Sequence, residues 1–235
     1  SPPTIHRGLV LFGCRDGWVY CLRLSDGRLA WRFMAAPRDI RTIAEAQPES
    51  LWPVCGSVLV VNGVAYVAAG RSSYLDGGIF LYGLDPATGR IVCERNVRSP
   101  HTGPLRPPSA QEAAKMEVPI GQNRTDYKTF LAPDHSDAFS MSGALNDVLV
   151  ADDGSVFLRQ MRFNLDLAPA AGPGQHLFST SSLLDDAENH RSHWVLGTGD
   201  FSRTRVAYPW ILTSLAVPYG LLMSFDETTV WGVQR

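Results

Sequence analysis

The densest group of residues that could do chemistry runs from Asp185 to His193, in the sequence DDAENHRSH. A metal site there would use His190, His193 and Asp186, because imidazole and carboxylate groups suit zinc and similar ions. The His-x-x-His spacing puts both rings on one side only in a helix, whereas in a strand they point to opposite faces. The competing interpretation is a turn whose aspartates cap backbone N–H groups and pair with Arg191. We expect no metal site, and His190, His193 and Asp186 are the candidates if there is one.

A second candidate site is the segment GRSSYLDGG, residues 70–78. Its Arg71, Tyr74 and Asp76 combine a cation, an aromatic ring and a carboxylate. Loops held on a rigid scaffold commonly carry binding residues. We therefore expect these three residues to face a ligand or a partner, and the alternative is a loop that only caps its own sheet. No nucleophile elbow or dinucleotide-binding pattern is visible elsewhere in the sequence.

The composition argues against two classes of function. The net charge is −2, and 19% of the residues are charged, so the chain lacks the basic field that nucleic-acid binding needs. The longest apolar run, residues 210–225, is interrupted by Pro218 and Gly220 and is too short to span a bilayer. We expect neither a nucleic-acid partner nor a transmembrane segment.

The cysteines are expected to be free and structural. A turn at Asp16-Gly17 would pair Cys14 with Val19 and Cys21 with Phe12, so the two sulfurs would not face each other. The spacing of the four cysteines is not that of a metal site, and a small buried thiol is the simpler interpretation.

Three strands are expected near the start of the chain, at residues 8–14, 18–24 and 29–33. They are separated by Asp16-Gly17 and by Ser25-Asp26-Gly27, and Asp-Gly between apolar runs is a strong hairpin signal. The apolar residues stand at consecutive positions, which indicates strands that are covered on both faces.

The same pattern returns further along the chain, in residues 58–95. Placing Gly27 on Gly89, a shift of 62 residues, aligns the two turns and puts Trp31 on Cys93. Self-similarity at this length indicates a repeat architecture. Between the repeats, residues 34–56 are expected to be an irregular connection with one helical turn near residues 43–46.

Four-stranded antiparallel units that repeat in series, each apolar on both faces, are typical of a β-propeller. We therefore predict an all-β chain that forms one incomplete domain over residues 1–235, a partial β-propeller of about four four-stranded antiparallel blades. The first unit is expected to lack its first strand, as in a fragment of a larger propeller. The predicted blade-like units are residues 8–33, 57–95, 139–167 and 176–235, with long loops at 34–56 and 96–138.

The long connections are expected to lie on one face of the propeller. Residues 34–56, 70–78 and 96–138 each follow either the second or the fourth strand of a unit, and both kinds of connection emerge at the same end of a blade. This placement predicts a surface built from loops.

These residues resemble the PQQ-like, quinoprotein-type β-propeller repeat, in which Gly-x-Val-Tyr-Ala-Leu-Asp-x-x-Thr-Gly is followed by a tryptophan. LYGLDPATG, residues 81–89, matches well, and GWVYCL, residues 17–22, matches a variant. The resemblance implies that Trp31 docks one blade on the next, with Gly27 and Gly89 in the turns, while Cys93 departs from the pattern. Residues after 139 look like PQQ-binding-like propellers of the planctomycete type, distant relatives of the outer-membrane barrel-assembly lipoprotein.

The clear repeats, the long loops on one face and the lack of a catalytic signature favour a non-catalytic scaffold or binding module. The resemblance implies that it belongs to an extracytoplasmic protein, periplasmic or on the cell surface. Its expected partners are a protein, a small molecule or a glycan on the loop face, together with the remaining blades of a longer parent chain. One alternative is part of a quinoprotein dehydrogenase that uses PQQ with calcium, although the adjacent cysteine pair of those enzymes is absent. A second alternative is a carbohydrate-binding or carbohydrate-active propeller, suggested by Tyr74 and Asp76. We expect no cofactor unless the dehydrogenase alternative holds.

Overall fold

The computed structural model describes most of the first hundred residues and parts of the remaining chain. The described residues are 2–44, 46–73, 75–98, 146–158, 161–170, 175–179, 194–198, 206–207, 210–211, 219–220, 222–226 and 228–233. They form strands, turns and extended segments, with no helix among them, and consequently none that could cross a membrane. The chain is all-β, as predicted.

The first blade is a complete four-stranded antiparallel sheet in the order β1-β2-β3-β4. Its strands are β1 (Thr4–His6), β2 (Leu9–Gly13), β3 (Trp18–Arg23) and β4 (Leu29–Met34). The prediction that this unit lacks its first strand is wrong, because β1 pairs with β2 through Thr4↔Leu11 and His6↔Leu9. The connecting turn uses Arg7 and Gly8, both with positive φ, a geometry that is usually indicated by Asn-Gly.

The second blade repeats this arrangement. Its strands are β7 (Leu59–Val61), β8 (Val64–Ala69), β9 (Ile79–Leu84) and β10 (Ile91–Val97), again antiparallel and in sequence order. Asn62 and Gly63 both have positive φ in the tight turn between β7 and β8, as the Asn-Gly signal predicts.

The later strands form smaller sheets among the described residues. β11 (Val150–Asp152), β12 (Ser155–Leu158) and β13 (Met161–Asn164) make a third antiparallel sheet. β14 (Gln175–Ser179), β15 (Trp194–Thr198) and β18 (Tyr219–Gly220) make another. The pairs β16 (Val206–Ala207) with β17 (Trp210–Ile211), and β19 (Leu222–Phe225) with β20 (Val230–Val233), complete the set in this part of the chain.

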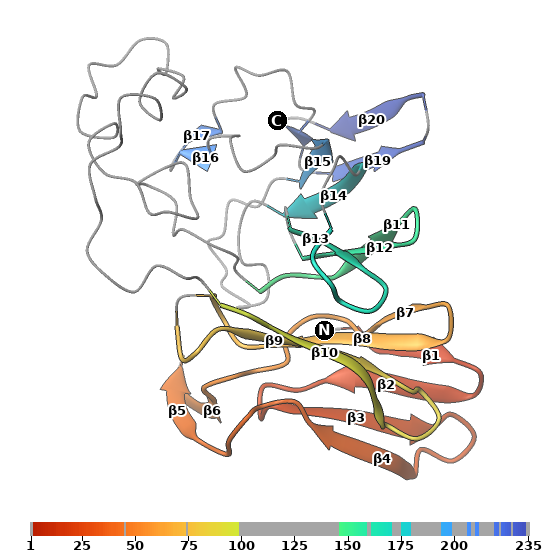
Figure 1. The fold of residues 1–235 in the computed structure, drawn as a ribbon, viewed down its shortest axis with the longest axis vertical. Coiled ribbons are helices and arrows are strands. Elements are labelled where there is room, and N and C mark those ends of the chain that lie inside the picture. Colours follow the sequence, from red (N-terminus) through yellow and green to blue (C-terminus); the bar gives the residue numbers. More distant parts are fainter. Residues whose placement is uncertain are drawn as a thin grey trace.

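The sheets follow one another along the chain, as blades of a propeller do (Figure 1). The first strand of each blade lies beside that of the next, β1 beside β7 and β7 beside β11. The second blade is covered on both faces. Its Ala65, Val67 and Leu84 pack in one core with the first blade, and its Tyr66, Ile79 and Leu81 pack in another with the third. The chain is therefore a partial β-propeller.

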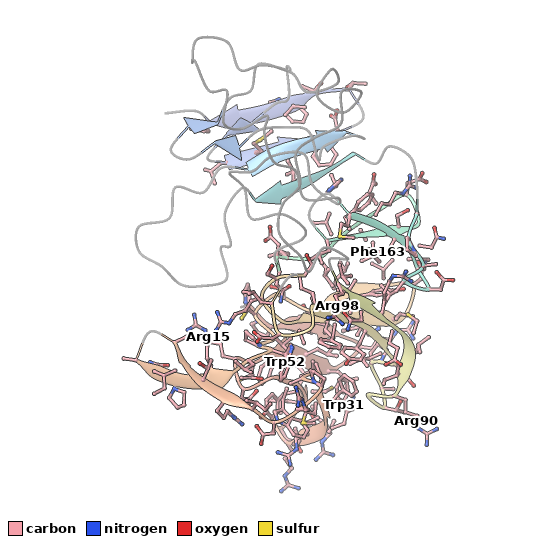
Figure 2. All side chains as sticks on the ribbon, turned by 60° about the vertical axis from the view of Figure 1, so that its left-hand side comes forward. Arg15, Trp31, Trp52, Arg90, Arg98 and Phe163 are labelled. Atoms are coloured by element: carbon pink, nitrogen blue, oxygen red, sulfur yellow. The ribbon has the colours of Figure 1, made fainter. Side chains whose placement is uncertain are left out.

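Trp31 lies at the interface between the first two blades (Figure 2). Its indole Nε1 donates a hydrogen bond of 2.9 Å to the carbonyl of Pro86, in the β9–β10 turn. The ring also covers Gly89, where a Cβ atom would lie only 2.6 Å from Trp31 Cε3. Gly89 is thus constrained twice, by this close approach and by its φ of +72°.

Two local predictions are wrong. The connection between the first two blades carries a β-hairpin, β5 (Arg41–Ala44) and β6 (Gln47–Ser50), in place of the expected helical turn. Cys21 pairs with Leu11 and not with Phe12, because the β2–β3 connection has four residues, 14–17, and not two. The conclusion that Cys14 and Cys21 form no disulfide still holds, since none of the four cysteines is disulfide-bonded.

Candidate functional site

The connections of the first two blades meet on one side of the propeller. We call residues 14–17, 35–58 and 70–78 the loop face. The backbone N–H of Ser50 donates to the Arg15 carbonyl at 2.8 Å, that of Val54 to Cys14 at 3.0 Å, and that of Gly70 to Pro53 at 3.1 Å. The predicted gathering of loops on one face is therefore confirmed for these segments. Most of the loop predicted at residues 96–138 lies outside the described residues.

Gly17 allows the first two segments to approach closely. It has φ of +90°, and a Cβ atom there would lie 2.8 Å from both Ala36 Cβ and Ser50 Oγ. Its carbonyl accepts hydrogen bonds of 3.0 Å from the backbone N–H groups of Ala35 and Ala36. The Asp16-Gly17 pair, which the sequence identifies as a turn, thus also anchors the connection to the second blade.

Trp52 holds the 70–78 segment against the 35–58 connection, in which it lies. Its indole is almost fully buried and donates a hydrogen bond of 2.8 Å from Nε1 to the Asp76 carbonyl. The ring meets Phe80 edge-on, with 6.4 Å between ring centroids. The guanidinium of Arg38 lies 5.8 Å from the Trp52 ring centroid, a distance suited to a cation–π contact.

Glu49 is a buried acidic residue at the centre of the loop face, only 4% exposed. Its carboxylate pairs with the guanidinium of Arg71 and lies 3.9 Å from Nη1 of Arg15. The three charges come from three separate connections: Glu49 from the β4–β7 connection, where it lies in β6, Arg71 from β8–β9 and Arg15 from β2–β3. Because a buried carboxylate needs such partners, Glu49 ties the three segments together.

The segment that leads into the third blade also contacts the loop face, through Asn146. Asn146 is buried, and its side-chain Nδ2 donates to the Gly70 carbonyl at 2.7 Å and to the Ala68 carbonyl at 3.3 Å. Its backbone N–H donates to the Arg71 carbonyl at 2.9 Å. Trp52 and Asn146 thus both hold the 70–78 loop through hydrogen bonds to its backbone. This favours a loop face that is already ordered before it binds a partner.

The predicted site residues take different positions. Arg71 points its guanidinium to Glu49, so its charge serves the assembly of the loop face. Asp76 is exposed on the same loop and has φ of +53°. Tyr74 lies outside the described residues, as do the metal candidates His190, His193 and Asp186.

The sequence did not single out Glu49 or Arg15. Glu49 directly precedes the mostly apolar run SLWPVC, residues 50–55, and a carboxylate beside such a run is the one signal that could have indicated burial. Its partners could not have been identified, because they lie in other connections and depend on the way two blades pack.

The β5–β6 hairpin projects from the sheets (Figures 1 and 2). Ile43, in β5, is 79% exposed. Arg38, Asp39 and Arg41 are exposed on the same connection, and Arg41 pairs with Asp39 at 3.0 Å between Nε and Oδ1. The projecting part of the loop face thus combines an apolar side chain with cationic groups.

The described residues hold no cluster of three or more histidine, cysteine, aspartate or glutamate side chains that could bind a cation. Glu49, the buried carboxylate of the loop face, is already engaged by two arginines.

Tyr20 offers a pH-dependent test of the β2–β3 connection. Its hydroxyl donates to Asp16 Oδ2 at 2.6 Å, and this hydrogen bond, followed by burial, raises the pKa of Tyr20 from 10 to about 12. The folded state keeps the phenolic proton longer than the unfolded state, so the stabilisation is complete below pH 10 and is lost as the pH rises through 12.

We expect Asp16→Ala to lower the pKa of Tyr20 towards 10, because the acceptor is removed. The measurement is an ultraviolet titration of phenolate, taken as the difference between each protein and its Tyr20→Phe counterpart. Asp26→Ala, in the β3–β4 turn, is the control and should leave the titration unchanged. An unshifted titration in Asp16→Ala would contradict the contact.

Comparison with known proteins gives only distant structural likeness. No protein-family profile and no curated protein sequence matches the chain. Among solved structures, it is similar to quinohemoprotein alcohol dehydrogenase ADHIIG from Pseudomonas putida HK5, at 14% identity and a TM-score of 0.42, over 83% of this chain and 31% of that one. It is also similar to BamB from Moraxella catarrhalis, at 13% identity and a TM-score of 0.32, over 81% of this chain and 44% of that one.

This chain therefore spans less than half the length of either protein. At this level of identity we transfer no function from them.

Proposed function

We propose that this chain is a non-catalytic, PQQ-like β-propeller module whose loop face binds a partner protein, as part of an extracytoplasmic protein. The observation that carries the proposal is the assembly of three connections around Glu49, with Trp52 and Asn146 as further supports. A surface held in this way loses little conformational entropy on binding. Loops ordered by buried charge and hydrogen bonds are typical of a binding surface on a rigid scaffold.

The chemistry of the projecting hairpin favours an acidic partner surface with an apolar recess. Ile43 supplies an exposed aliphatic side chain, and Arg38 and Arg41 supply cations on the same connection, with Arg41 paired to Asp39. Rim charges of this kind steer association and fix orientation, while a central apolar side chain supplies affinity. We therefore assign recognition to residues 38–43, with Asp76 at the edge of the contact.

The test is capture of a partner by immobilised protein from an extracytoplasmic extract of the source cells. We expect a bound protein that is lost, by about tenfold or more, when Ile43 is replaced by Asp, since a central apolar contact commonly contributes more than about 1 kcal/mol. Charge reversal at Arg41 (Arg41→Glu) should weaken capture and reduce its dependence on salt.

The matched control is Val92→Asp, which introduces the same charge at a comparably exposed apolar position on the outer strand β10. This variant should bind as the unaltered protein does. Equal capture by Ile43→Asp and the unaltered protein would place binding elsewhere. Stoichiometric uptake of PQQ with calcium, seen as quinone absorbance, would favour the dehydrogenase alternative and contradict the proposal.

A further inference from the structure

The two outer edges of the β5–β6 hairpin are not equivalent. Among the described strands, β5 pairs with β6 alone, in a register that places Arg41 opposite Ser50 and Ile43 opposite Pro48. In an antiparallel pair, opposite residues alternate between pairs that exchange backbone hydrogen bonds and pairs whose N–H and C=O groups point away from each other. The class to which each pair belongs therefore decides which backbone groups face outward.

Arg41 and Ser50 form a pair whose backbone groups point outward. The neighbouring pair is hydrogen-bonded, because the N–H of Leu51 donates to the Ile40 carbonyl at 3.0 Å. The N–H of Ser50 itself leaves the hairpin and donates to the Arg15 carbonyl at 2.8 Å. Both observations put the N–H and C=O of Arg41 on the edge of β5 that is remote from β6.

The outer edge of β6 is closed. Pro48 lies two residues before Ser50, so its backbone nitrogen faces the same outer edge, where it has no N–H to donate. The N–H of Ser50 also faces this edge, and the β2–β3 connection uses it as a donor. A proline and a covering segment are two of the means by which proteins keep a strand edge from pairing.

The outer edge of β5 is open. By the same alternation, Arg41 and Ile43 both turn their N–H and C=O groups to this edge. None of these four groups has a hydrogen-bond partner in the part of the chain that the structure describes. Donors and acceptors at alternate positions of an exposed strand form the template to which a further strand pairs.

The side chains beside this edge indicate what the added strand carries. Arg41 and Ile43 lie two residues apart on one face of β5, and both are exposed. Arg38 is a second exposed cation, while the pair of Arg41 with Asp39 joins two exposed side chains and contributes little. Because opposite side chains on neighbouring strands interact, an acidic residue suits the position opposite Arg41 and an apolar residue suits the position opposite Ile43.

We propose that the outer edge of β5 binds an extended segment of the partner protein, which adds a third, antiparallel strand to the hairpin and places an apolar residue opposite Ile43 and an acidic residue opposite Arg41. The inference rests on the proposed function and deepens it, since side chains alone would suffice for the recognition described there. Antiparallel pairing is assigned because it is slightly more stable per residue than parallel pairing. Arg15 and Arg71 hold β6 through Glu49, so the edge is ordered before the strand is added.

The test uses a synthetic peptide as the added strand. The probe has seven residues and blocked ends, with valine third, glutamate fifth and threonine elsewhere, so that valine lies opposite Ile43 and glutamate opposite Arg41 in antiparallel register. It is added to the full chain, and amide hydrogen exchange is resolved to single residues. We expect exchange at Arg41 and Ile43 to slow by about tenfold or more at saturating peptide, because their N–H groups gain acceptors.

Methylation of peptide nitrogens separates backbone recognition from side-chain recognition. N-methyl groups on the valine and the glutamate remove the two N–H groups that face β5 and keep every side chain, and they should abolish the slowing. An N-methyl group on the threonine between them is the matched control, because that nitrogen faces away from β5, and it should leave the slowing intact. Lysine in place of the glutamate should weaken binding.

The protein supplies a second pair of variants. Ile43→Pro removes the N–H at the outer edge without removing a β5–β6 hydrogen bond, and edge strands tolerate proline, so this variant should abolish the slowing at Arg41. Ile43→Val keeps the N–H and a branched side chain, and it should retain the slowing. Exchange at Thr42, whose N–H faces β6, reports whether the hairpin itself is intact in both variants.

Three outcomes would overturn the proposal. Equal slowing by the unmodified peptide and by the peptide methylated at valine and glutamate would show recognition through side chains alone. The absence of slowing at Arg41 and Ile43 would show that the edge does not pair. Greater slowing by a peptide in which glutamate precedes valine would contradict the antiparallel arrangement. Failure of the proposed function has a different signature, because partner capture that does not depend on Ile43 leaves the slowing by the peptide in place.

Discussion

Replacing Trp31 by alanine is expected to lower the free energy of unfolding by about 3 kcal/mol, as truncation of large aromatic side chains in packed interfaces does. Two effects combine. The loss of the indole leaves a cavity over Gly89, which has no side chain to fill it. The Pro86 carbonyl also loses the 2.9 Å hydrogen bond from Nε1 and keeps only the 3.9 Å contact from Cys21 Sγ among the described residues, and a weakened bond at a partly buried acceptor adds to the destabilisation.

The measurement is urea unfolding followed by circular dichroism. Trp231→Ala is the matched control, because Trp231 in β20 is 54% exposed and its truncation should change stability by less than about 1 kcal/mol. If Trp31→Ala lowers the free energy of unfolding no more than Trp231→Ala does, Trp31 does not hold the first two blades together.

Replacing Arg71 by alanine is expected to destabilise the loop face by about 2–3 kcal/mol, because removing one partner of a buried ion pair leaves a charge without compensation. Among the described residues, the change leaves the buried carboxylate of Glu49 with Arg15, 3.9 Å away, as its remaining cationic partner. The lower end of the usual range applies because the Arg71 side chain is about a third exposed.

The double variant Arg71→Leu with Glu49→Leu should be more stable than Arg71→Ala alone, since neither charge is then left behind. Hydrogen exchange in residues 41–50 reports the effect locally, because the hairpin depends on this pair. The control is Arg41→Ala, which removes an exposed pair with Asp39 and should change stability by less than about 0.5 kcal/mol. If the changes in the free energy of unfolding caused by the two single substitutions at Glu49 and Arg71 simply add in the double variant, the two side chains do not interact and the account is contradicted.

The sequence predicted the features that depend on local chemistry and repetition. The 62-residue shift aligned the turns that contain Gly27 and Gly89, and both turns have the same backbone conformation. Runs apolar on both faces predicted that sheets would be covered on both sides, as the second blade is.

Three features of the structure were not predicted from the sequence, each for a physical reason. β1 was missed because Arg7-Gly8 forms a turn that is normally indicated by asparagine before glycine. The β5–β6 hairpin was missed because its strands lack clear alternation and contain Pro48. The role of Glu49 could not be predicted, because its partners come from other connections and meet it only after the blades pack.

The central claim is that the loop face binds a partner protein. Hydrogen exchange of the chain with and without the captured partner tests it most directly. Slowed exchange in residues 38–50 and 75–78, with no change in the outer strand at residues 91–97, is the result that the proposal predicts. Slowing confined to the outer strand, or the absence of any slowing in the loop face, would contradict it.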